Sequence, residues 1–422
     1  MNAEIKQQAP QIDFPTLYSK KEAHGGLDKR IQLIAQNFKP SNKKHNILSI
    51  DGGGVRCVIA MEALHALEKS IQLTSGNPNR LLSDEFDLVA GTSAGGMLAS
   101  AIAMGMPMDD IRIFVEQSIQ HWFSPAPWYR RHKALYEKNH MAAALRDSLG
   151  ESTTLGSNKL KTGLMLMTHN WSEDTEWLLT NHHGAAPDND PDDSHLDLSL
   201  WQITLASASA PAYFTPETVR YGRQSPRDVV LQDGGMTGHL NPAFRAFRYA
   251  TQCTNGPQWQ TGEDSLNLVS IGSGDSSHRR APNSSRRRGV LRAMVDIPNT
   301  LMQCSVREQE ALCELYGKSS NIYGNTINDN SGEDSTSHVA DNCGSTLKLF
   351  SYHRFNPQLD TNNLSALGFE TLTAGQIMPM DKSENYSLLS EIGQKTASIN
   401  QMSSIAMSCI TENNQNKPQI LG

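Results

Sequence analysis

The sequence predicts an α/β fold with a mostly parallel central sheet, and three observations lead to this prediction. Two apolar, β-favouring runs, residues 47–50 and 86–90, lie early in the chain. Each run ends in a glycine-rich turn. Each turn leads into an apolar segment of helical character. Strand, turn and helix in tandem are typical of the βαβ unit, in which consecutive strands lie parallel.

The second turn, residues 91–95 (Gly-Thr-Ser-Ala-Gly), matches the G-x-S-x-G pattern of a nucleophile elbow. In such an elbow, a tight turn between a strand and a helix exposes one serine hydroxyl at the carboxyl end of a sheet. Glycines are needed there because the backbone is strained and neighbouring elements pack against the turn. Ser93 is therefore the candidate nucleophile, although similar small-residue turns also occur without catalysis.

The first turn, residues 51–56 (Asp-Gly-Gly-Gly-Val-Arg), opens a predicted helix whose first backbone N–H groups lack helical partners. Such a helix N-terminus binds anions, and in an acyl-transfer enzyme the anion is the tetrahedral oxyanion. Phosphate binding is the alternative. However, the turn lacks the G-x-x-x-x-G-K-[ST] arrangement, and Cys57 occupies the last glycine position of G-x-G-x-x-G. The pattern therefore favours an oxyanion site over a nucleotide site.

Two kinds of base could serve Ser93. A Ser–His–Asp arrangement needs a histidine, but none of the fourteen histidines stands in a distinctive local motif. Asp233 is the other candidate, because it follows the β-like run 228–231 and precedes two glycines. In a dry pocket the pKa of a carboxyl rises toward the working pH, so that the carboxylate can accept the serine proton. An Asp-Gly-Gly segment can also be a simple turn.

These segments, in this order, resemble the patatin-like phospholipases. The family motifs D-G-G-G-x-R-G, G-x-S-x-G and D-G-[GA] correspond to residues 51–57, 91–95 and 233–235. Residues 206–214 and 352–359 resemble two further family segments, A-S-x-A-x-P-x-x-F and Y-x-R-x-N-x-x-L. The similarity covers roughly residues 45–365. It implies a three-layer α/β/α sandwich and the activity of a calcium-independent, phospholipase A type acyl hydrolase.

The resemblance also implies a catalytic dyad of Ser93 and Asp233 that lacks histidine. In this mechanism an acyl-serine intermediate forms and is then hydrolysed by water. A glycerophospholipid would yield a fatty acid and a lysophospholipid, and no metal or other cofactor is required. The resemblance assigns the oxyanion hole to these residues: Gly52, Gly53, Gly54, Arg56 and Ala94.

The chain departs from the family pattern at Cys57, where glycine is usual, and at Ser209, where alanine is usual. Cysteine is small and packs well when it is buried, so we expect the chain to tolerate Cys57. The alternative is a reactive thiol beside the anion site.

Two other segments have more than one interpretation. The aromatic residues Trp122, Phe123, Trp128 and Tyr129 are either ordinary core residues or a lip that contacts acyl chains or the membrane interface. The basic stretch 278–292 is a solvated loop, a contact for anionic lipid headgroups, or a nuclear targeting signal.

Composition excludes several classes of function. The net charge of −7 argues against a general nucleic-acid binder. No apolar stretch is long enough to span a membrane, and no apolar signal segment is visible near residue 1. Six scattered cysteines are typical of reduced thiols in a cytoplasm. The acidic run 188–193 lacks the spacing of a calcium loop. We therefore expect a protein that is cytoplasmic, or exported without a cleaved signal, and peripheral at membranes.

Along the chain we expect a polar arm over residues 1–44, a catalytic domain over 45–365, and a helical segment with a loose tail over 366–422 that packs on this domain. Within these parts the pattern predicts helices at 27–38, 198–210 and 290–315, a hairpin of 164–168 with 176–180, and a strand at 266–271. We expect a mobile loop at 318–345. Helical structure is predicted again at 371–407, with these residues facing the body: Leu388, Leu389, Ile392 and Ile399.

Two other function classes stay open. One is a different serine acyl enzyme, such as a thioesterase or acyltransferase with a histidine base. The other is a non-catalytic lipid-binding module that keeps the fold. By resemblance, we expect membrane phospholipids as partners and an activating protein or small-molecule signal, as in bacterial members that act as effectors or defence enzymes. We expect no nucleic-acid partner.

Overall fold

The computed structural model describes residues 44–182, 195–253, 255–276, 290–323 and 348–410. Several segments considered above lie outside these residues: the arm 1–43 with its expected helix 27–38, the acidic run 188–193, most of the basic stretch 278–292, residues 324–345 of the expected loop, and the tail 411–422.

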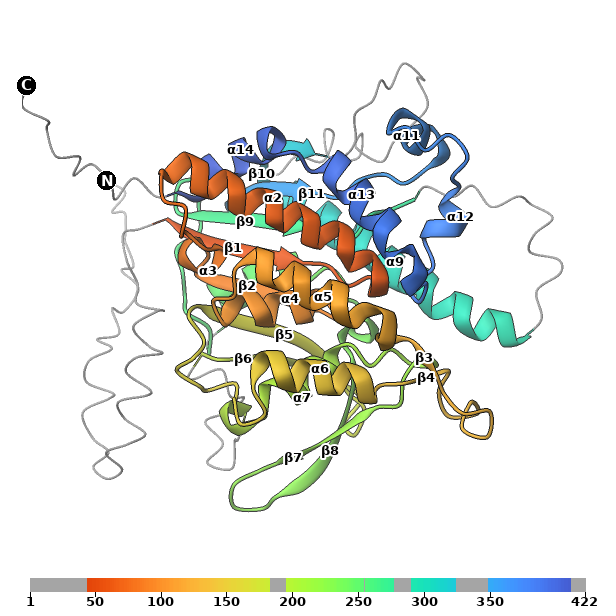
Figure 1. Cartoon of the computed structure of the whole chain (residues 1–422). Helices are drawn as coiled ribbons and strands as arrows, with labels where there is room; N and C mark the ends of the chain where they lie inside the picture. Colours follow the sequence, from red (N-terminus) through yellow and green to blue (C-terminus); the bar gives the residue numbers. More distant parts are fainter. Residues whose placement is uncertain (1–43, 183–194, 254, 277–289, 324–347, 411–422) are drawn as a thin grey trace, which may run out of the picture.

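A nine-stranded mixed sheet forms the centre of the molecule, in the order β10-β11-β9-β1-β2-β5-β8-β7, with β6 paired to β5 (Figure 1). The strands are β1 (His45–Ile50), β2 (Leu88–Thr92), β5 (Gly163–Asn170), β6 (Thr175–Thr180), β7 (Glu217–Tyr221), β8 (Arg227–Asp233), β9 (Leu266–Ile271), β10 (Gly317–Tyr323) and β11 (Phe350–Phe355). All pairings from β10 to β5 are parallel, whereas β5–β6, β5–β8 and β7–β8 are antiparallel. The prediction of a mostly parallel sheet is confirmed, and so is the hairpin.

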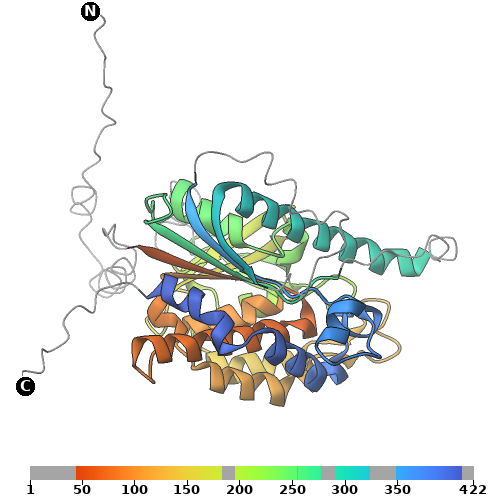
Figure 2. The same cartoon turned by 90° about the horizontal axis from the view of Figure 1, so that it is seen from above.

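Helices cover both faces of the sheet (Figure 2). One layer consists of α8 (Ala243–Gln252) and α9 (Val290–Tyr316). The opposite layer consists of α2 (Cys57–Ser75), α4 (Ala94–Ala103), α5 (Met108–Trp122), α6 (Asn139–Leu149), α7 (Leu200–Ser207), α13 (Tyr386–Thr396) and α14 (Ile399–Cys409). Successive residues of β1 serve the two layers in turn, with Ile47 on one side and Leu48 on the other. This arrangement is the three-layer α/β/α sandwich that the resemblance implies, and it explains why β1 is buried along its whole length.

The C-terminal helices α13 and α14 both pack against α2. Leu389 and Ile392 are fully buried and Leu388 packs on the core, as predicted. The prediction for Ile399 is wrong, because this residue opens α14 and is 39% exposed. A further short helix, α11 (Thr361–Ala366), crosses the expected domain boundary at 365/366.

Two other predictions need correction. The expected mobile loop at 318–345 begins instead as strand β10, which pairs with β11 at the edge of the sheet. Its polar sequence misled the prediction, since edge strands tolerate polar residues. The helix expected at 198–210 is shorter, because α7 spans only Leu200–Ser207. The helix α9 follows the prediction closely.

The first turn of α4 lies very close to the end of β1. A Cβ added at Gly95 would lie 2.4 Å from the carbonyl oxygen of Asp51 and 2.5 Å from that of Ile50. Only glycine permits this approach, since both neighbours are backbone atoms that cannot move aside. The approach brings the elbow against the start of the glycine loop, residues 52–54.

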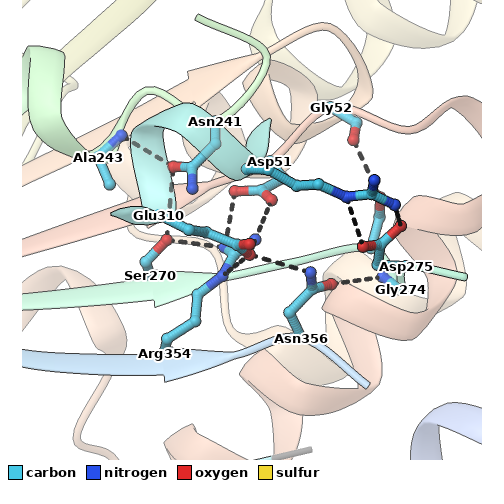
Figure 3. Close-up of polar contacts among 12 residues, drawn as sticks. Asp51, Gly52, Asn241, Ala243, Ser270, Gly274, Asp275, Glu310, Arg354 and Asn356 are labelled. Carbon is cyan, nitrogen blue, oxygen red and sulfur yellow. Dashed lines mark hydrogen bonds and ion pairs between the residues drawn. The ribbon is translucent and has the colours of Figure 1, made fainter. Parts of the chain in front are cut away.

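A buried ion pair joins the carboxyl ends of β1, β9 and β11 (Figure 3). Arg354 of β11 donates hydrogen bonds to both carboxylate oxygens of Asp51, at 2.9 Å and 2.6 Å, and to Ser270 Oγ of β9 at 2.8 Å. Asp51 directly follows β1, and both charged side chains are 3% exposed. Burial raises the pKa of Asp51 to about 6, against the lowering effect of Arg354. The carboxylate is therefore ionised at neutral pH.

The ion pair continues into a larger network. Glu310 of α9 accepts hydrogen bonds from Arg354 at 2.8 Å and from Asn356 at 3.1 Å. Asn356 in turn accepts from the backbone N–H of Gly274 at 3.0 Å, and Arg56 donates to the carbonyl oxygen of Gly274 at 2.7 Å. The network thus connects α9, β11 and the segment after β9 to both flanks of the glycine loop.

The close approach at Gly95 predicts an asymmetric response to alanine. Replacing Gly95 by Ala should lower the free energy of unfolding by about 1–3 kcal/mol, because β1 and α4 must separate. The matched control is Gly375→Ala, where the new Cβ would lie no nearer than 3.9 Å to any atom. This control should leave stability unchanged or raise it by up to about 1 kcal/mol. Denaturant unfolding measures both, and equal stability of the two variants would contradict the prediction.

The buried ion pair predicts a large loss when only one partner is removed. Arg354→Met should lower the free energy of unfolding by about 3–5 kcal/mol, because it leaves Asp51 buried without its counter-charge. The double variant Asp51→Asn/Arg354→Met should recover part of this loss. As a control, Arg220→Met breaks an exposed pair with Asp228 and should cost less than about 1 kcal/mol. Denaturant titration decides, and a loss at Arg354 no larger than at Arg220 would refute the prediction.

Candidate active site

The structure brings Ser93 and Asp233 together, although 140 positions separate them in the sequence. Ser93 Oγ donates a hydrogen bond to Asp233 Oδ2 at 2.7 Å. Ser93 is 9% exposed and Asp233 is 2% exposed. A serine hydroxyl and a carboxylate in this geometry are within reach of direct proton transfer.

The register of the sheet accounts for this meeting. Strand β5 lies between β2 and β8, and its residues Met167 and Thr168 are neighbours in sequence. Met167 pairs with Thr92, the residue before Ser93, whereas Thr168 pairs with Asp233. Because the antiparallel β8 overlaps only the last three residues of β5, its last residue lies beside the last residue of β2. A parallel sheet alone does not predict this detail.

The backbone of Ser93 is strained as an elbow requires. Its φ is 56° and its ψ is −131°, which are rare values for a residue with a side chain. Ser207 helps to hold this conformation: its Oγ accepts the Ser93 N–H at 3.0 Å and donates to the carbonyl oxygen of Met167 at 2.7 Å. Sequence reasoning noted the 206–214 segment but gave Ser207 no role, because its partners come from other strands.

Asp233 ends β8 and also caps the turn that follows. Its Oδ1 accepts the Gly235 N–H at 2.7 Å, while Oδ2 accepts from Ser93. Burial raises the pKa of Asp233 to about 7, although both hydrogen bonds lower it. The raised value is the physical condition that a carboxylate base needs, since a carboxylate with an ordinary pKa is a weak base toward serine.

The glycine loop and the start of α4 present backbone N–H groups near Ser93. In the part of the chain that is described, the N–H groups of Gly53, Gly54 and Ala94 have no acceptor. Gly54, at φ +60°, and Ala94 border the same pocket as Ser93. The Gly52 N–H is already bonded to the carbonyl oxygen of Leu240 at 2.9 Å.

Arg56 is buried at 2% exposure, and its guanidinium donates to the carbonyl oxygen of Gly274. It is not among the residues that line the pocket. Its position therefore supports the glycine loop rather than facing a bound anion.

A small apolar pocket of about 30 Å³, open to the surface, lies at Ser93. Most of its walls are apolar or aromatic, and none of the residues that line it is charged. These residues are Gly54, Ser93, Ala94, Met97, Trp122, Phe123, Met141, Ala208, Ala210, Tyr213, Phe214 and Met380. The four aromatic residues at positions 122–129 therefore have two different environments. Trp122 and Phe123 line the pocket, whereas Trp128 and Tyr129 are exposed.

The segment after α12 (Ala374–Ile377) closes one side of the pocket. Met380 lines the cavity, and its carbonyl oxygen accepts the Val55 N–H at 2.8 Å. The next residue, Asp381, accepts a hydrogen bond from the Tyr136 hydroxyl at 2.7 Å. Sequence reasoning missed Met380, since a methionine in an irregular segment carries no motif.

The structure supports neither a histidine base for Ser93 nor a reactive thiol at Cys57. Among the histidines of the described ranges, none lines the pocket and none hydrogen bonds to Ser93 or Asp233. Cys57 is buried, and burial raises the pKa of its thiol to about 12, so the sulfur stays protonated and unreactive. The cysteine is accommodated as a small packing residue.

Two features are absent from the residues that the structure describes. These residues contain no group of three or more His, Cys, Asp or Glu side chains placed to hold a metal ion. No helix within them is both long enough and apolar enough to cross a membrane.

Comparison with known proteins agrees with the motifs. Residues 48–246 match the family model described as patatin-like phospholipase. The chain is 26% identical over 261 residues to Patatin-17 of Solanum cardiophyllum, covering 58% of this chain and 65% of that protein. It is 28% identical over 262 residues to the Probable inactive patatin-like protein 9 of Arabidopsis thaliana, with 59% and 65% covered. It is 26% identical over 256 residues to the cGAMP-activated phospholipase of Vibrio cholerae, with 56% and 66% covered.

The chain thus spans just under two thirds of the length of each of these relatives. Among solved structures, the crystal structure of VipD from Legionella pneumophila matches with a TM-score of 0.35 and 14% identity, covering 87% of this chain and 67% of that one. A TM-score this low supports no conclusion about fold or function. The family model, the curated relatives and the three-layer α/β/α fold agree with one another, and residues 48–246 form a patatin-like phospholipase domain.

Proposed function

We propose that this protein is a serine lipid acyl hydrolase of the phospholipase A or lysophospholipase type, which cleaves fatty-acyl esters of membrane glycerophospholipids. The observation that carries the proposal is the buried 2.7 Å hydrogen bond from Ser93 to Asp233 beside an apolar pocket. The match of residues 48–246 to the patatin-like phospholipase model supports the same class of reaction.

In the first half of the proposed reaction, Asp233 accepts the hydroxyl proton as Ser93 Oγ attacks the ester carbonyl carbon. The carbonyl oxygen becomes an oxyanion beside the unpaired N–H groups of Gly53, Gly54 and Ala94. Each such donor, fixed in a site that excludes water, contributes about 3 kcal/mol of transition-state stabilisation. Because these groups are backbone atoms held by the fold, they need no reorganisation during the reaction.

In the second half, the protonated Asp233 gives its proton to the leaving alcohol oxygen, and the acyl group stays on Ser93. A water molecule then attacks the acyl-serine ester while Asp233 again accepts a proton. The products are a fatty acid and a lysophospholipid. Each step uses Asp233 in both protonation states, which suits a carboxyl whose pKa lies near 7.

The pocket supports a fatty-acyl rather than a polar substrate group. Its lining residues include Met97, Trp122 and Phe214 and no charged residue, so a hydrocarbon chain can enter without leaving a charge buried. A phosphate headgroup is excluded by the same argument and would remain outside. We therefore place the acyl chain in the pocket and the headgroup toward solvent.

Two further features belong to the proposal. The catalytic domain extends over residues 45–365, and the described part of the C-terminal segment, residues 366–410, packs on it; the contacts of α13 and α14 with α2, and of Met380 with Val55 beside the glycine loop, support this packing. One relative is named a cGAMP-activated phospholipase. By analogy, we propose that a protein or small-molecule signal raises the activity of this chain at the membrane. Hydrolysis measured with and without cyclic nucleotide or host-cell lysate tests this point.

The dyad predicts that both of its members are essential. Ser93→Ala and Asp233→Asn should each lower kcat/KM for phospholipid vesicles by at least about a thousandfold, since nucleophile and base act as a unit. Asp228→Asn is the matched control, because this exposed residue lies on the same strand and should leave turnover unchanged. Lipid products are quantified by mass spectrometry.

A fluorophosphonate probe provides a second readout. It should label the parent protein at Ser93 and fail to label Ser93→Ala. Retained turnover in Asp233→Asn would instead favour a histidine base. Absence of labelling in the parent would favour a non-catalytic lipid-binding module.

The raised pKa of Asp233 predicts a specific pH dependence. The base works only when it is deprotonated, so kcat/KM should rise with pH and level off above about pH 7. Below that value, the rate should fall about tenfold for each pH unit. A pH–rate profile with a soluble short-chain ester measures this directly, without effects of pH on vesicles. A profile that stays flat down to pH 5 would rule out a base with this pKa.

A further inference from the structure

One loop beside the pocket exposes two adjacent large aromatic side chains. It connects β3 (Ser124–Pro125) to β4 (Tyr136–Glu137). Trp128 is 83% exposed and Tyr129 is 56% exposed, and their ring centroids lie 6.0 Å apart. Elsewhere in the ranges that the structure covers, large exposed hydrophobic residues stand singly, as Trp171 does. Single exposed residues are ordinary, but an adjacent pair indicates a contact surface.

The loop is held in this conformation by its own hydrogen bonds. Its ends are joined by the Ala126 N–H, which donates to the carbonyl oxygen of Leu135 at 2.9 Å. Within the loop, Arg130 N–H donates to Pro127 and Lys133 N–H donates to Arg130, both at 2.8 Å. Because the backbone is fixed in this way, the aromatic side chains are presented to solvent rather than left there by disorder.

The loop is also basic. Residues 130–133 read Arg-Arg-His-Lys, and all four are exposed. Residues 124–136 contain no aspartate or glutamate, and Glu137 lies 3.5 Å from Arg130 at the edge of the loop. This local positive charge contrasts with the net charge of −7 of the chain. An anionic surface is therefore the complementary partner.

Both ends of the loop are fastened to the wall of the pocket. Phe123, the residue before β3, lines the pocket. At the other end, the N–H groups of Leu135 and Tyr136 donate to the carbonyl oxygens of Ala212 and Tyr213, each at 2.9 Å. The loop projects from the body at the β3–β4 hairpin (Figure 1).

We propose that residues 126–135 form a docking loop that binds the surface of an anionic phospholipid bilayer. Trp128 and Tyr129 enter the interface, where aromatic side chains with one polar atom are most favourable. Arg130, Arg131 and Lys133 contact the lipid phosphates. Docking in this way places the mouth of the Ser93 pocket against the membrane. The inference rests on the proposed function, because the position of the loop matters only if the pocket receives a lipid.

An acidic protein surface would match the charge of the docking loop but not its other properties. It would not explain the exposed tryptophan, which prefers the boundary between water and hydrocarbon. Nor would it explain why the loop shares its base with a pocket that is lined by apolar side chains. The bilayer accounts for the charge, the aromatic residues and the position together.

The experiment measures vesicle binding separately from hydrolysis. The parent is the full chain with Ser93→Ala, so that vesicles stay intact, and the vesicles contain equimolar phosphatidylcholine and phosphatidylglycerol. Trp128→Ser/Tyr129→Ser should lower the partition coefficient in a sedimentation assay by about tenfold or more. Arg130→Gln/Arg131→Gln/Lys133→Gln should abolish the preference for these vesicles over pure phosphatidylcholine, a preference of about tenfold or more in the parent. Trp171→Ser, at a site on the β5–β6 turn that is 60% exposed, should bind like the parent.

Two further measurements make each outcome decisive. Circular dichroism and hydrolysis of a soluble short-chain ester, with Ser93 intact, should be unchanged in the loop variants, since the backbone hydrogen bonds of the loop remain and only the side-chain bond from Arg131 to the carbonyl oxygen of Ala126 is removed. If the aromatic variant binds vesicles like the parent, or the cationic variant keeps the anionic preference, the docking loop is refuted and an acidic macromolecule becomes the alternative. If ester hydrolysis is absent in every protein while vesicle binding follows the expected pattern, the proposed function fails and the docking loop stands.

Discussion

The ion pair between Asp51 and Arg354 fixes where the glycine loop begins. Each charge is buried, so neither is tolerable without the other, and the end of β1 is held to β11. Glu310 and Asn356 extend this restraint to α9 and to the segment after β9. The loop between these anchors contains little more than glycines, which supply no side-chain packing of their own. The direction in which its N–H groups point is therefore set by the buried ion pair and its hydrogen-bonded neighbours.

The second constraint is the reversal of direction at β8. An antiparallel strand that overlapped β5 along its whole length would carry its last residue to the opposite edge of the sheet, away from the elbow. Strand β8 instead overlaps only residues 168–170, at the carboxyl end of β5. Here β8 runs antiparallel to β5 and pairs Asp233 with Thr168, one residue from the partner of Thr92. Backbone hydrogen bonds of the ladder therefore set the distance between Ser93 and Asp233. The pair consequently depends on strand register more than on any flexible side chain.

The features that could be predicted from the sequence are those in which the backbone conformation restricts the type of residue. The turns at Gly52 and Gly95 can be recognised in the sequence because only glycine fits a close approach or a positive φ. The strands beside them can be recognised as apolar runs. Ser207, Glu310 and Met380 were not predictable as partners, since each acts through a contact between distant elements. Strand β10 was missed for a related reason: its polar residues fit an edge strand as well as a loop, and only pairing with β11 decides between them. Ile399 opens α14 at the surface, where the helical period alone does not fix the orientation.

In the proposed mechanism, one property of the site serves two purposes. The removal of water from around Asp233 raises its pKa to about 7, and the neighbouring apolar pocket accepts a hydrocarbon chain for the same reason. A wetter pocket would weaken both, because solvation of the carboxylate lowers its basicity and solvation of the walls weakens acyl binding. Under the proposed function, substrate must still reach this dry interior from a bilayer. An enzyme of this design gains from holding the pocket mouth at the membrane surface, since an acyl chain can then pass from lipid to protein with little exposure to water.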